Sequence, residues 1–336
     1  MRSIILLIRI WIAATSAIAK ATFTRLLLGP TLPTWSWRTE WAVAFARRVI
    51  TVAADHKEDP WINSIGLRIK MPLPASLVGA VRVTSRQMGR NVADHFERVD
   101  ATRNAATILY FHGGGYIFGN PGTHREHIAR IVARTGATAT APTYRLAPAH
   151  PFPAAVDDAI DSYRALLARC SSPREVIVAG DSAGAGLAVA MVHRARAEGL
   201  PLPAGMILFS PYVDIDHTGY TIRTNAPTDF LPVRELSSPN DWYAPQDQHA
   251  DPEASPIQAD LTGFPPMLVF AGGAEMLLAD SLRLAENAER DGVDCQLVIE
   301  PEMPHVWPVL IPWEPASKRT LAKCAAWIPK AVNGRS

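Results

Sequence analysis

Cysteine is scarce in this sequence, with three residues (Cys170, Cys295 and Cys324) among 336. Three scattered cysteines cannot form a disulfide framework, and their spacing matches no metal-binding pattern. We therefore expect free thiols in a reducing compartment. A charge imbalance is also missing, because 33 Lys and Arg stand against 32 Asp and Glu. No long basic run occurs either, which argues against a nucleic-acid partner.

The sequence also lacks an uninterrupted apolar run of the roughly 18 residues that a membrane-spanning helix needs. Its apolar N-terminal stretch is broken by Arg9 and continues in an amphipathic rhythm past Lys20. This pattern favours a helix that docks on the protein, or that contacts a membrane surface through residues 1–28. A cleaved signal peptide over residues 1–19 is the weaker alternative. We expect a cytoplasmic protein, with membrane association left open.

Apolar strands alternate with helical stretches through most of the chain, after two N-terminal helices joined by a Pro- and Trp-rich elbow. This alternation predicts an α/β fold with a mostly parallel central sheet and helices on both faces. The predicted strands cover residues 65–83 (antiparallel), 107–111, 137–141, 176–179, 206–209, 267–271 and 295–299, and the predicted helices cover residues 39–52, 123–134, 154–168, 185–192, 279–290 and 315–327. In such sheets the chemistry lies at the carboxyl ends of the strands.

The interval from about residue 214 to residue 256 breaks the alternation, because it is rich in Pro, Asp and Asn and weakly periodic. A structureless loop of this length is uncommon in a compact domain unless it is an insertion or a lid. We expect residues 1–62 and 214–250 to form a helical cap. The α/β core would then comprise residues 63–213 and 251–336.

The strongest motif is Gly180-Asp181-Ser182-Ala183-Gly184, which follows an apolar run and precedes a small-residue helical pattern. Strand, sharp turn and helix are the context in which G-x-S-x-G forms a nucleophile elbow. The two glycines allow the backbone to turn tightly around a serine held in a strained conformation. Ser182 is therefore the candidate nucleophile.

A run of three glycines, His112-Gly113-Gly114-Gly115, follows the predicted strand at residues 107–111. Glycines leave backbone N–H groups unhindered, and such groups near a nucleophile stabilise the oxyanion of a tetrahedral intermediate. Gly113, Gly114 and Ala183 are the predicted donors. A phosphate cradle is the alternative, but no G-x-G-x-x-G pattern and no P-loop lysine is present.

A serine hydroxyl needs a positioned base to become a nucleophile. His305 fits this role because it follows the predicted strand at residues 295–299 in a short loop at the carboxyl edge of the sheet. His124 and His127 lie on a predicted helix, where we expect an exposed face. His112 is expected to orient a loop through hydrogen bonds.

The base in turn needs a carboxylate that fixes its tautomer and stabilises the imidazolium. The chain order serine, acid, histidine points to the residues after the predicted strand at 267–271. Glu275 lies in the loop directly after this strand and is the preferred acid. Asp280 is the alternative, although its place at the start of the next helix suits a capping or first-turn residue.

Seven co-linear motifs resemble those of the hormone-sensitive-lipase-like bacterial carboxylesterases, a branch of the α/β-hydrolase superfamily. They are His112–Tyr116, Tyr144–Pro148, Gly180–Gly184, Ser210–Asp214, Asp251–Pro256, Gly272–Glu275 with Asp280, and Met303–Trp307. The resemblance covers about residues 30–330 and implies the α/β-hydrolase fold. The sequence departs from the family pattern at Ala149, where a glutamate is usual, and at Ala185, where a second glycine is usual. Both positions lie outside the catalytic groups.

The resemblance implies a serine carboxylesterase that hydrolyses short- to medium-chain acyl esters through an acyl-enzyme intermediate. It implies Ser182 as nucleophile, Glu275 as acid and His305 as base, and it requires no cofactor and no metal. The expected partner is a small-molecule ester, and a homodimer stays open. The alternatives are a non-catalytic small-molecule-binding relative of the same fold and a membrane-associated lipid esterase or deacetylase.

Overall fold

The computed structural model of the protein describes residues 2–55, 68–100, 106–231 and 242–334. Within these residues, eight strands form one sheet in the order β1-β2-β4-β3-β5-β6-β7-β8. The strands are β1 (Val81–Met88), β2 (Asn91–Arg98), β3 (Thr107–Phe111), β4 (Thr138–Pro142), β5 (Val176–Asp181), β6 (Gly205–Phe209), β7 (Met267–Gly272) and β8 (Cys295–Glu300). Strands β3 to β8 pair in parallel, whereas β2 is antiparallel to both of its neighbours.

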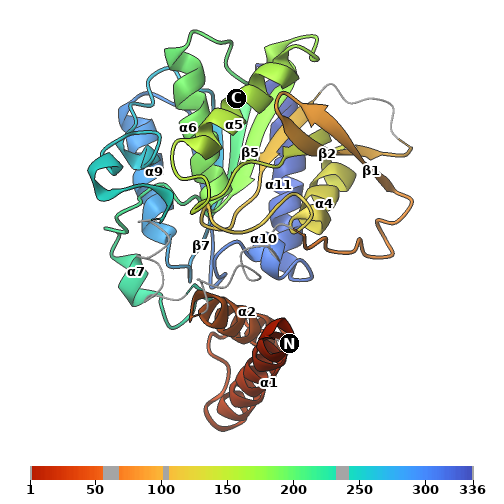
Figure 1. The fold of residues 1–336 in the computed structure, drawn as a ribbon, viewed down its shortest axis with the longest axis vertical. Coiled ribbons are helices and arrows are strands. Elements are labelled where there is room, and N and C mark those ends of the chain that lie inside the picture. Colours follow the sequence, from red (N-terminus) through yellow and green to blue (C-terminus); the bar gives the residue numbers. More distant parts are fainter. Residues whose placement is uncertain (1, 56–67, 101–105, 232–241, 335–336) are drawn as a thin grey trace.

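Helices cover both faces of this sheet, as the alternating sequence pattern predicts. The α-helices of the described residues are α1 (Arg2–Leu28), α2 (Trp37–Asp55), α4 (Arg125–Thr135), α5 (Ala154–Leu167), α6 (Ala183–Ala197), α7 (Thr221–Thr224), α9 (Leu278–Arg290), α10 (Trp307–Leu310) and α11 (Pro315–Val332). Helices α5, α6 and α9 pack on one face, and α4 and α11 pack on the other (Figure 1). The predicted α/β fold is confirmed.

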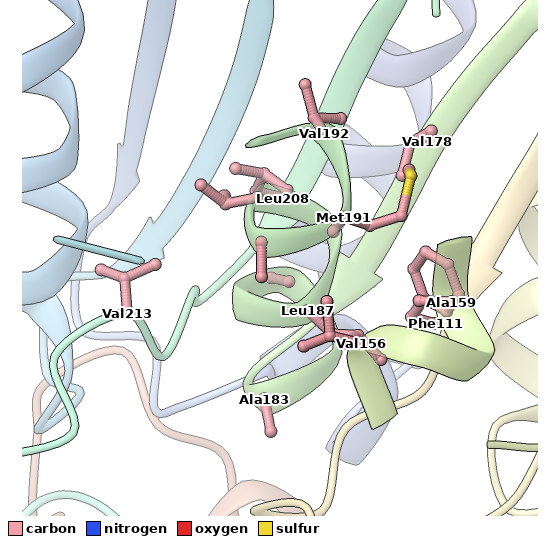
Figure 2. Packing of buried hydrophobic residues seen from close by; sticks show 14 of the residues in the cluster. Phe111, Val156, Ala159, Val178, Ala183, Leu187, Met191, Val192, Leu208 and Val213 are labelled. Atoms are coloured by element: carbon pink, nitrogen blue, oxygen red, sulfur yellow. The ribbon is translucent and has the colours of Figure 1, made fainter. Parts of the chain in front are cut away.

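Strand β5 is buried on both sides, which explains its continuous apolar sequence. Val178 belongs to the hydrophobic core beneath α5 and α6, while Ile177 belongs to the core on the opposite face. Figure 2 shows Leu187 and Met191 of α6 within the first of these cores. The helix that follows β5 is therefore packed directly against the sheet, so the strand and the helix on either side of the turn are both fixed by packing.

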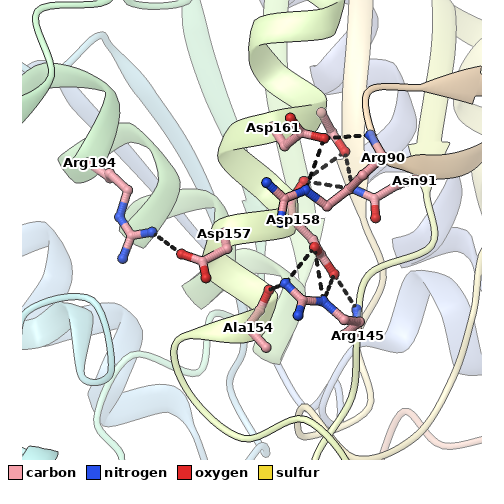
Figure 3. A network of polar contacts seen from close by, with 9 residues as sticks. Arg90, Asn91, Arg145, Ala154, Asp157, Asp158, Asp161 and Arg194 are labelled. Carbon is pink, nitrogen blue, oxygen red and sulfur yellow. Dashed lines mark hydrogen bonds and ion pairs between the residues drawn. The ribbon is translucent and has the colours of Figure 1, made fainter.

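A polar network attaches α5 to its surroundings (Figure 3). Asp158 is fully buried and accepts hydrogen bonds from the backbone amide of Arg145 at 2.8 Å and from its Nε at 2.9 Å. Asp157, one residue earlier, pairs with Arg194 of α6 at 2.5 Å. A buried carboxylate is costly without such partners. The network therefore ties the loop after β4 to both helices.

Helices α1 and α2 form a hairpin at one end of the molecule, at the bottom of Figure 1. The elbow between them contacts the loop after β8, because the amide of Thr34 donates to Glu302 Oε2 at 2.8 Å and Trp35 Nε1 donates to the Glu302 carbonyl at 2.5 Å. Arg47 of α2 donates to the carbonyl of Pro227 at 2.8 Å. The hairpin therefore adjoins the carboxyl edge of the sheet.

The antiparallel strands predicted at residues 65–83 lie elsewhere. The structure has no strand at residues 68–80, residues 65–67 are outside the described part, and β1 begins only at Val81. Strand β2 was not predicted, because polar Asp94, His95 and Glu97 hide the alternation of its buried residues. The predicted limit between cap and core at residue 62 also lies outside the described residues.

Candidate active site

Ser182 lies in the turn between β5 and α6, with φ of 52° and ψ of −123°. Positive φ is rare for a residue with a side chain and marks local strain. A Cβ at Gly180 would meet the carbonyl of Gly184, and a Cβ at Gly184 would meet the carbonyls of Phe111 and His112. Both glycines are thus required by close packing of backbone on backbone. The predicted strand, turn and helix around Ser182 are confirmed.

His305 and Ser182 lie together although 123 residues separate them. The Nε2 atom of His305 is 2.9 Å from the Ser182 hydroxyl oxygen, which is a hydrogen-bond distance. His305 is buried in the loop between β8 and α10, whereas Ser182 is partly exposed. A buried imidazole therefore faces an accessible hydroxyl.

Glu275 is fully buried in the loop between β7 and α9. Its Oε2 atom lies 3.6 Å from His305 Nδ1, a close ion-pair distance on the side of the ring away from Ser182. Burial alone disfavours the imidazolium, but the charge of Glu275, with smaller contributions from Asp229 and Asp181, raises the pKa of His305 above its ordinary value of 6.5. The imidazole of His305 therefore has the serine hydroxyl at one ring nitrogen and the carboxylate at the other.

Asp280 lies in the first turn of α9, as its position in the sequence suggests. It is fully buried, and its Oδ2 atom accepts hydrogen bonds from the amides of Val213 and Asp214, each at 3.1 Å. Burial raises the pKa of Asp280 to about 7. These contacts join α9 to the loop after β6, and among the described residues Asp280 forms no hydrogen bond and no ion pair with His305.

The glycine loop after β3 departs from prediction at one position. The amide of Gly113 donates to Asp181 Oδ1 at 3.1 Å, so this N–H is already engaged. Gly114 and Gly115 have φ of 124° and 62°, and no acceptor among the described residues takes a hydrogen bond from their amides. The amide of Ala183 is at the start of α6, where helical N–H groups lack an intrahelical acceptor.

A buried polar cluster supports this loop. Asp181 Oδ1 also accepts from the Tyr110 hydroxyl at 2.7 Å, and its Oδ2 lies 3.1 Å from His124 Nε2. Burial opposes ionisation of Asp181, but the contacts with His124 and Tyr110 lower its pKa to about 2. A charged Asp181 therefore holds the Gly113 amide in place.

Three other histidines, His112, His124 and His127, lie near the glycine loop, and two of them are not where they were expected. His124 and His127 are buried, so the predicted exposed face is wrong, because α4 turns this side toward Asp181 and the sheet. His112 lies with Nδ1 2.8 Å from the Gly113 carbonyl and stacks on Tyr144 at 4.3 Å between ring centroids. His112 thus contacts the glycine loop, as expected.

Two further residues contact the proposed acid and base, and no sequence pattern assigned a role to either. Ser210 follows β6 within a family-like motif, and its hydroxyl donates to Glu275 Oε2 at 2.5 Å. Asp229 lies in the irregular interval after residue 214, and its carboxylate accepts a hydrogen bond from the His305 amide at 3.2 Å. An aspartate in an irregular segment carries no periodic signal, so only the fold reveals its position.

A strained serine after a buried strand, in line with an imidazole and a carboxylate, is the arrangement of a serine hydrolase. Residues 108–309 match the family described as having the alpha/beta hydrolase fold, and the chain belongs to this family.

Curated relatives and solved structures agree. The chain is 38% identical to an acetyl-hydrolase of Streptomyces hygroscopicus over 233 residues, covering 69% of this chain and 78% of that protein. It is 36% identical to an esterase of Acinetobacter venetianus over 232 residues, covering 68% and 77%. The crystal structure of an esterase from the bacterial hormone-sensitive lipase family has a TM-score of 0.75 at 30% identity, covering 95% of this chain and 98% of that one. The structure of EstE5 soaked with p-nitrophenyl butyrate has a TM-score of 0.76 at 30% identity, covering 87% and 99%. The resemblance to this esterase family is confirmed, and the protein is a carboxylic ester hydrolase.

Proposed function

We propose that Ser182, His305 and Glu275 are the catalytic triad of a serine carboxylesterase that hydrolyses short- to medium-chain acyl esters. The observation that carries this assignment is the 2.9 Å contact between His305 Nε2 and the Ser182 hydroxyl, with Glu275 on the opposite side of the ring. The strained turn presents the hydroxyl at the carboxyl edge of the sheet, where ligands of such folds bind.

In the proposed reaction, His305 takes the hydroxyl proton while Ser182 Oγ attacks the ester carbonyl. Collapse of the tetrahedral intermediate breaks the bond to the alcohol oxygen, which receives the proton from His305. Water then attacks the acyl-enzyme with the same imidazole as base, releasing the carboxylic acid and restoring Ser182. Glu275 stabilises the imidazolium in both halves of the reaction.

For the oxyanion we propose the amides of Gly114, Gly115 and Ala183. Gly115 replaces Gly113 of the sequence-based prediction, because the Gly113 amide is held by Asp181. We further infer that the α1–α2 hairpin, together with the described residues between 214 and 250, forms a cap. Contacts of the hairpin with Glu302 and Pro227 support this assignment.

The triad is tested by the burst of p-nitrophenol from p-nitrophenyl butyrate. Wild type should release a burst equal to the concentration of active sites, whereas Ser182→Ala should release none. Ser281→Ala is a matched control, because it removes a fully buried serine hydroxyl on α9 that has no hydrogen-bond partner among the described residues. Wild type and Ser182→Ala hydrolysing equally slowly would instead support the non-catalytic relative.

We also propose that the N-terminal hairpin contacts an anionic membrane surface. Residues 1–55 contain seven Lys and Arg and two acidic residues, Glu40 and Asp55, although the whole chain is balanced. Glu40 is buried and paired with Arg25 at 3.2 Å. Phe23, Leu26 and Leu27 on α1 are each about two-thirds exposed. Apolar side chains beside uncompensated basic charge are what binds a peripheral helix to anionic lipid.

Of the helices that the structure describes, none has the length and hydropathy to cross a membrane. The proposed contact is therefore peripheral, and co-sedimentation with lipid vesicles tests it. We expect binding to phosphatidylglycerol vesicles, weaker binding to phosphatidylcholine vesicles, and loss of binding in Phe23→Ser with Leu27→Ser. Val78→Ser is the control, since the side chain of Val78 is 65% exposed, as is that of Phe23, but Val78 lies outside the hairpin. Light scattering checks the alternative. A dimer that persists in the presence of vesicles and binds no lipid would show that a second copy of the chain covers the exposed face of α1.

A further inference from the structure

Asp229 lies between the loop that carries Glu275 and the loop that carries His305. Its Oδ2 atom accepts a hydrogen bond of 2.7 Å from the amide of Met276, the residue after Glu275. Its Oδ1 atom accepts a bond of 3.2 Å from the amide of His305. We propose that Asp229 is a positioning residue that fixes the separation of Glu275 and His305. This inference rests on the proposed triad.

The chemistry of the contact explains why a carboxylate is needed. Asp229 is fully buried, and Oδ1 also accepts from the Phe230 amide at 2.7 Å. An ionised carboxylate is an acceptor on both oxygens and can bind both loops at once. An Asn side chain has one acceptor oxygen and would turn an NH₂ group toward one of the two loops. A leucine would leave the buried amides of both loops without an acceptor, which destabilises the folded protein.

The residues before Asp229 bind the acid loop as well. Asn225 Nδ2 donates to the carbonyl of Glu275 at 3.0 Å, and Thr228 Oγ1 donates to the carbonyl of Ala274 at 2.9 Å. Residues 225–229 therefore run along the loop between β7 and α9 and hold its backbone at several successive residues. Asp229 extends this attachment to His305.

Helix α2 holds the same segment from the other side. Arg47 Nε donates to the carbonyl of Asp229 at 2.8 Å, and Arg47 Nη2 donates to the carbonyl of Pro227 at 2.8 Å. Arg47 thus holds residues 227–229 on one side, and Asp229 bonds the loops of the proposed acid and base on the other. Arg47 and Asp229 therefore connect α2 to the loops that carry Glu275 and His305, in addition to the contacts of the elbow with Glu302.

The charges around His305 make the role measurable. Glu275 and Asp229 in two different loops, and Asp181 at the end of β5, each raise the pKa of His305. Arg47 faces Asp229 from α2. Asp229 bonds the backbone amide of His305 rather than its ring, so removing its charge should lower the pKa of His305 and leave the imidazole beside Ser182.

The experiment compares Asp229→Asn with Asp280→Asn, using p-nitrophenyl butyrate. Asp280 is a matched control, because it is equally buried and its Oδ2 atom also accepts hydrogen bonds from two backbone amides, but it forms no hydrogen bond or ion pair with His305 among the described residues. For Asp229→Asn we expect kcat to fall about 10- to 100-fold with KM nearly unchanged. The ascending limb of kcat/KM against pH should move to lower pH. Asp280→Asn should retain kcat and the position of this limb.

Glu275→Gln is assayed in parallel, together with the thermal midpoint of every variant. The positioning role is refuted if Asp229→Asn keeps wild-type kcat and pH profile while Glu275→Gln loses turnover. It is also refuted if the thermal midpoint falls but the limb stays in place, because Asp229 would then serve stability alone. If Glu275→Gln itself keeps wild-type turnover, the triad assignment is the one that fails.

If Asp229→Asn does not fold, Arg47→Gln tests the outer end of the same connection. We expect a smaller fall in kcat with KM unchanged, since the carboxylate remains but its segment is held less firmly. Wild-type kcat in a folded Arg47→Gln would contradict the connection from α2 to the catalytic loops.

Discussion

The hydroxyl of Ser210 donates a 2.5 Å hydrogen bond to Glu275 Oε2, the same oxygen that lies 3.6 Å from His305 Nδ1. Ser210 Oγ also accepts a hydrogen bond from the amide of Val306 at 3.0 Å. A single side chain after β6 therefore touches both the proposed acid and the residue next to the proposed base. Strands β6, β7 and β8 are neighbours in the sheet, so the loops at their carboxyl ends meet here.

Ser210→Ala should lower kcat about tenfold and leave KM nearly unchanged. The substitution removes a charge-assisted hydrogen bond that orients Glu275 toward His305, and Ser210 does not touch the position of the substrate in the proposed reaction. Steady-state kinetics with p-nitrophenyl butyrate checks this, with Ser281→Ala as the control for loss of a buried hydroxyl. A tenfold rise in KM with no change in kcat would contradict the orienting role.

The two candidate acids should separate clearly on substitution. Glu275→Gln keeps the shape of the side chain but removes the charge that stabilises the imidazolium, so we expect kcat to fall roughly 10²- to 10⁴-fold. Asp280→Asn should lose less than about threefold, because Asp280 binds backbone amides away from His305. Steady-state kcat for both variants checks the assignment. The reverse ranking would make Asp280 the acid.

The pH dependence of kcat/KM should report the raised pKa of His305. The reaction needs a neutral imidazole, so activity should increase as the pH rises through the pKa of this residue. Because the nearby carboxylates stabilise the imidazolium, the midpoint of the ascending limb should lie above 6.5. A pH profile of the free enzyme at low substrate concentration measures it. A midpoint well below 6.5 would show that burial outweighs the carboxylate charges.

The sequence predicts the centre of the fold better than its edges. Strands β3, β5 and β7 are buried on both faces, so their apolar runs end close to the observed limits. Strand β2 pairs at the antiparallel side of the sheet and carries polar residues that obscure its pattern. Local sequence shows where an apolar strand lies, whereas the position of a strand with mixed polar and apolar residues depends on the strands that pair with it.

The same contrast holds in the site. That Ser182 and His305 lie close together could be predicted, because each follows a strand of a parallel sheet within a few residues. The hydrogen bond of the Gly113 amide could not be predicted, since it depends on the Asp181 carboxylate at the end of the neighbouring strand β5. The position of Asp229 could not be predicted either, because it bonds two loops that meet only in the folded chain.

Asp280 should make stability depend on pH in a way that its asparagine variant does not. Burial raises the pKa of Asp280 from 3.8 to about 7 in the folded protein, so the folded state binds this proton more tightly than the unfolded chain. This tighter proton binding stabilises the folded protein. Its contribution is fully present below pH 3.8 and is lost as the pH rises through about 7. Asn at this position keeps one oxygen that can accept from the Val213 and Asp214 amides, and it carries no charge. The thermal midpoint of Asp280→Asn relative to wild type should therefore rise by a few degrees between about pH 5 and about pH 8. Thermal unfolding of both proteins across this range measures the difference, and curves that stay parallel would show that Asp280 is ionised in the folded state throughout.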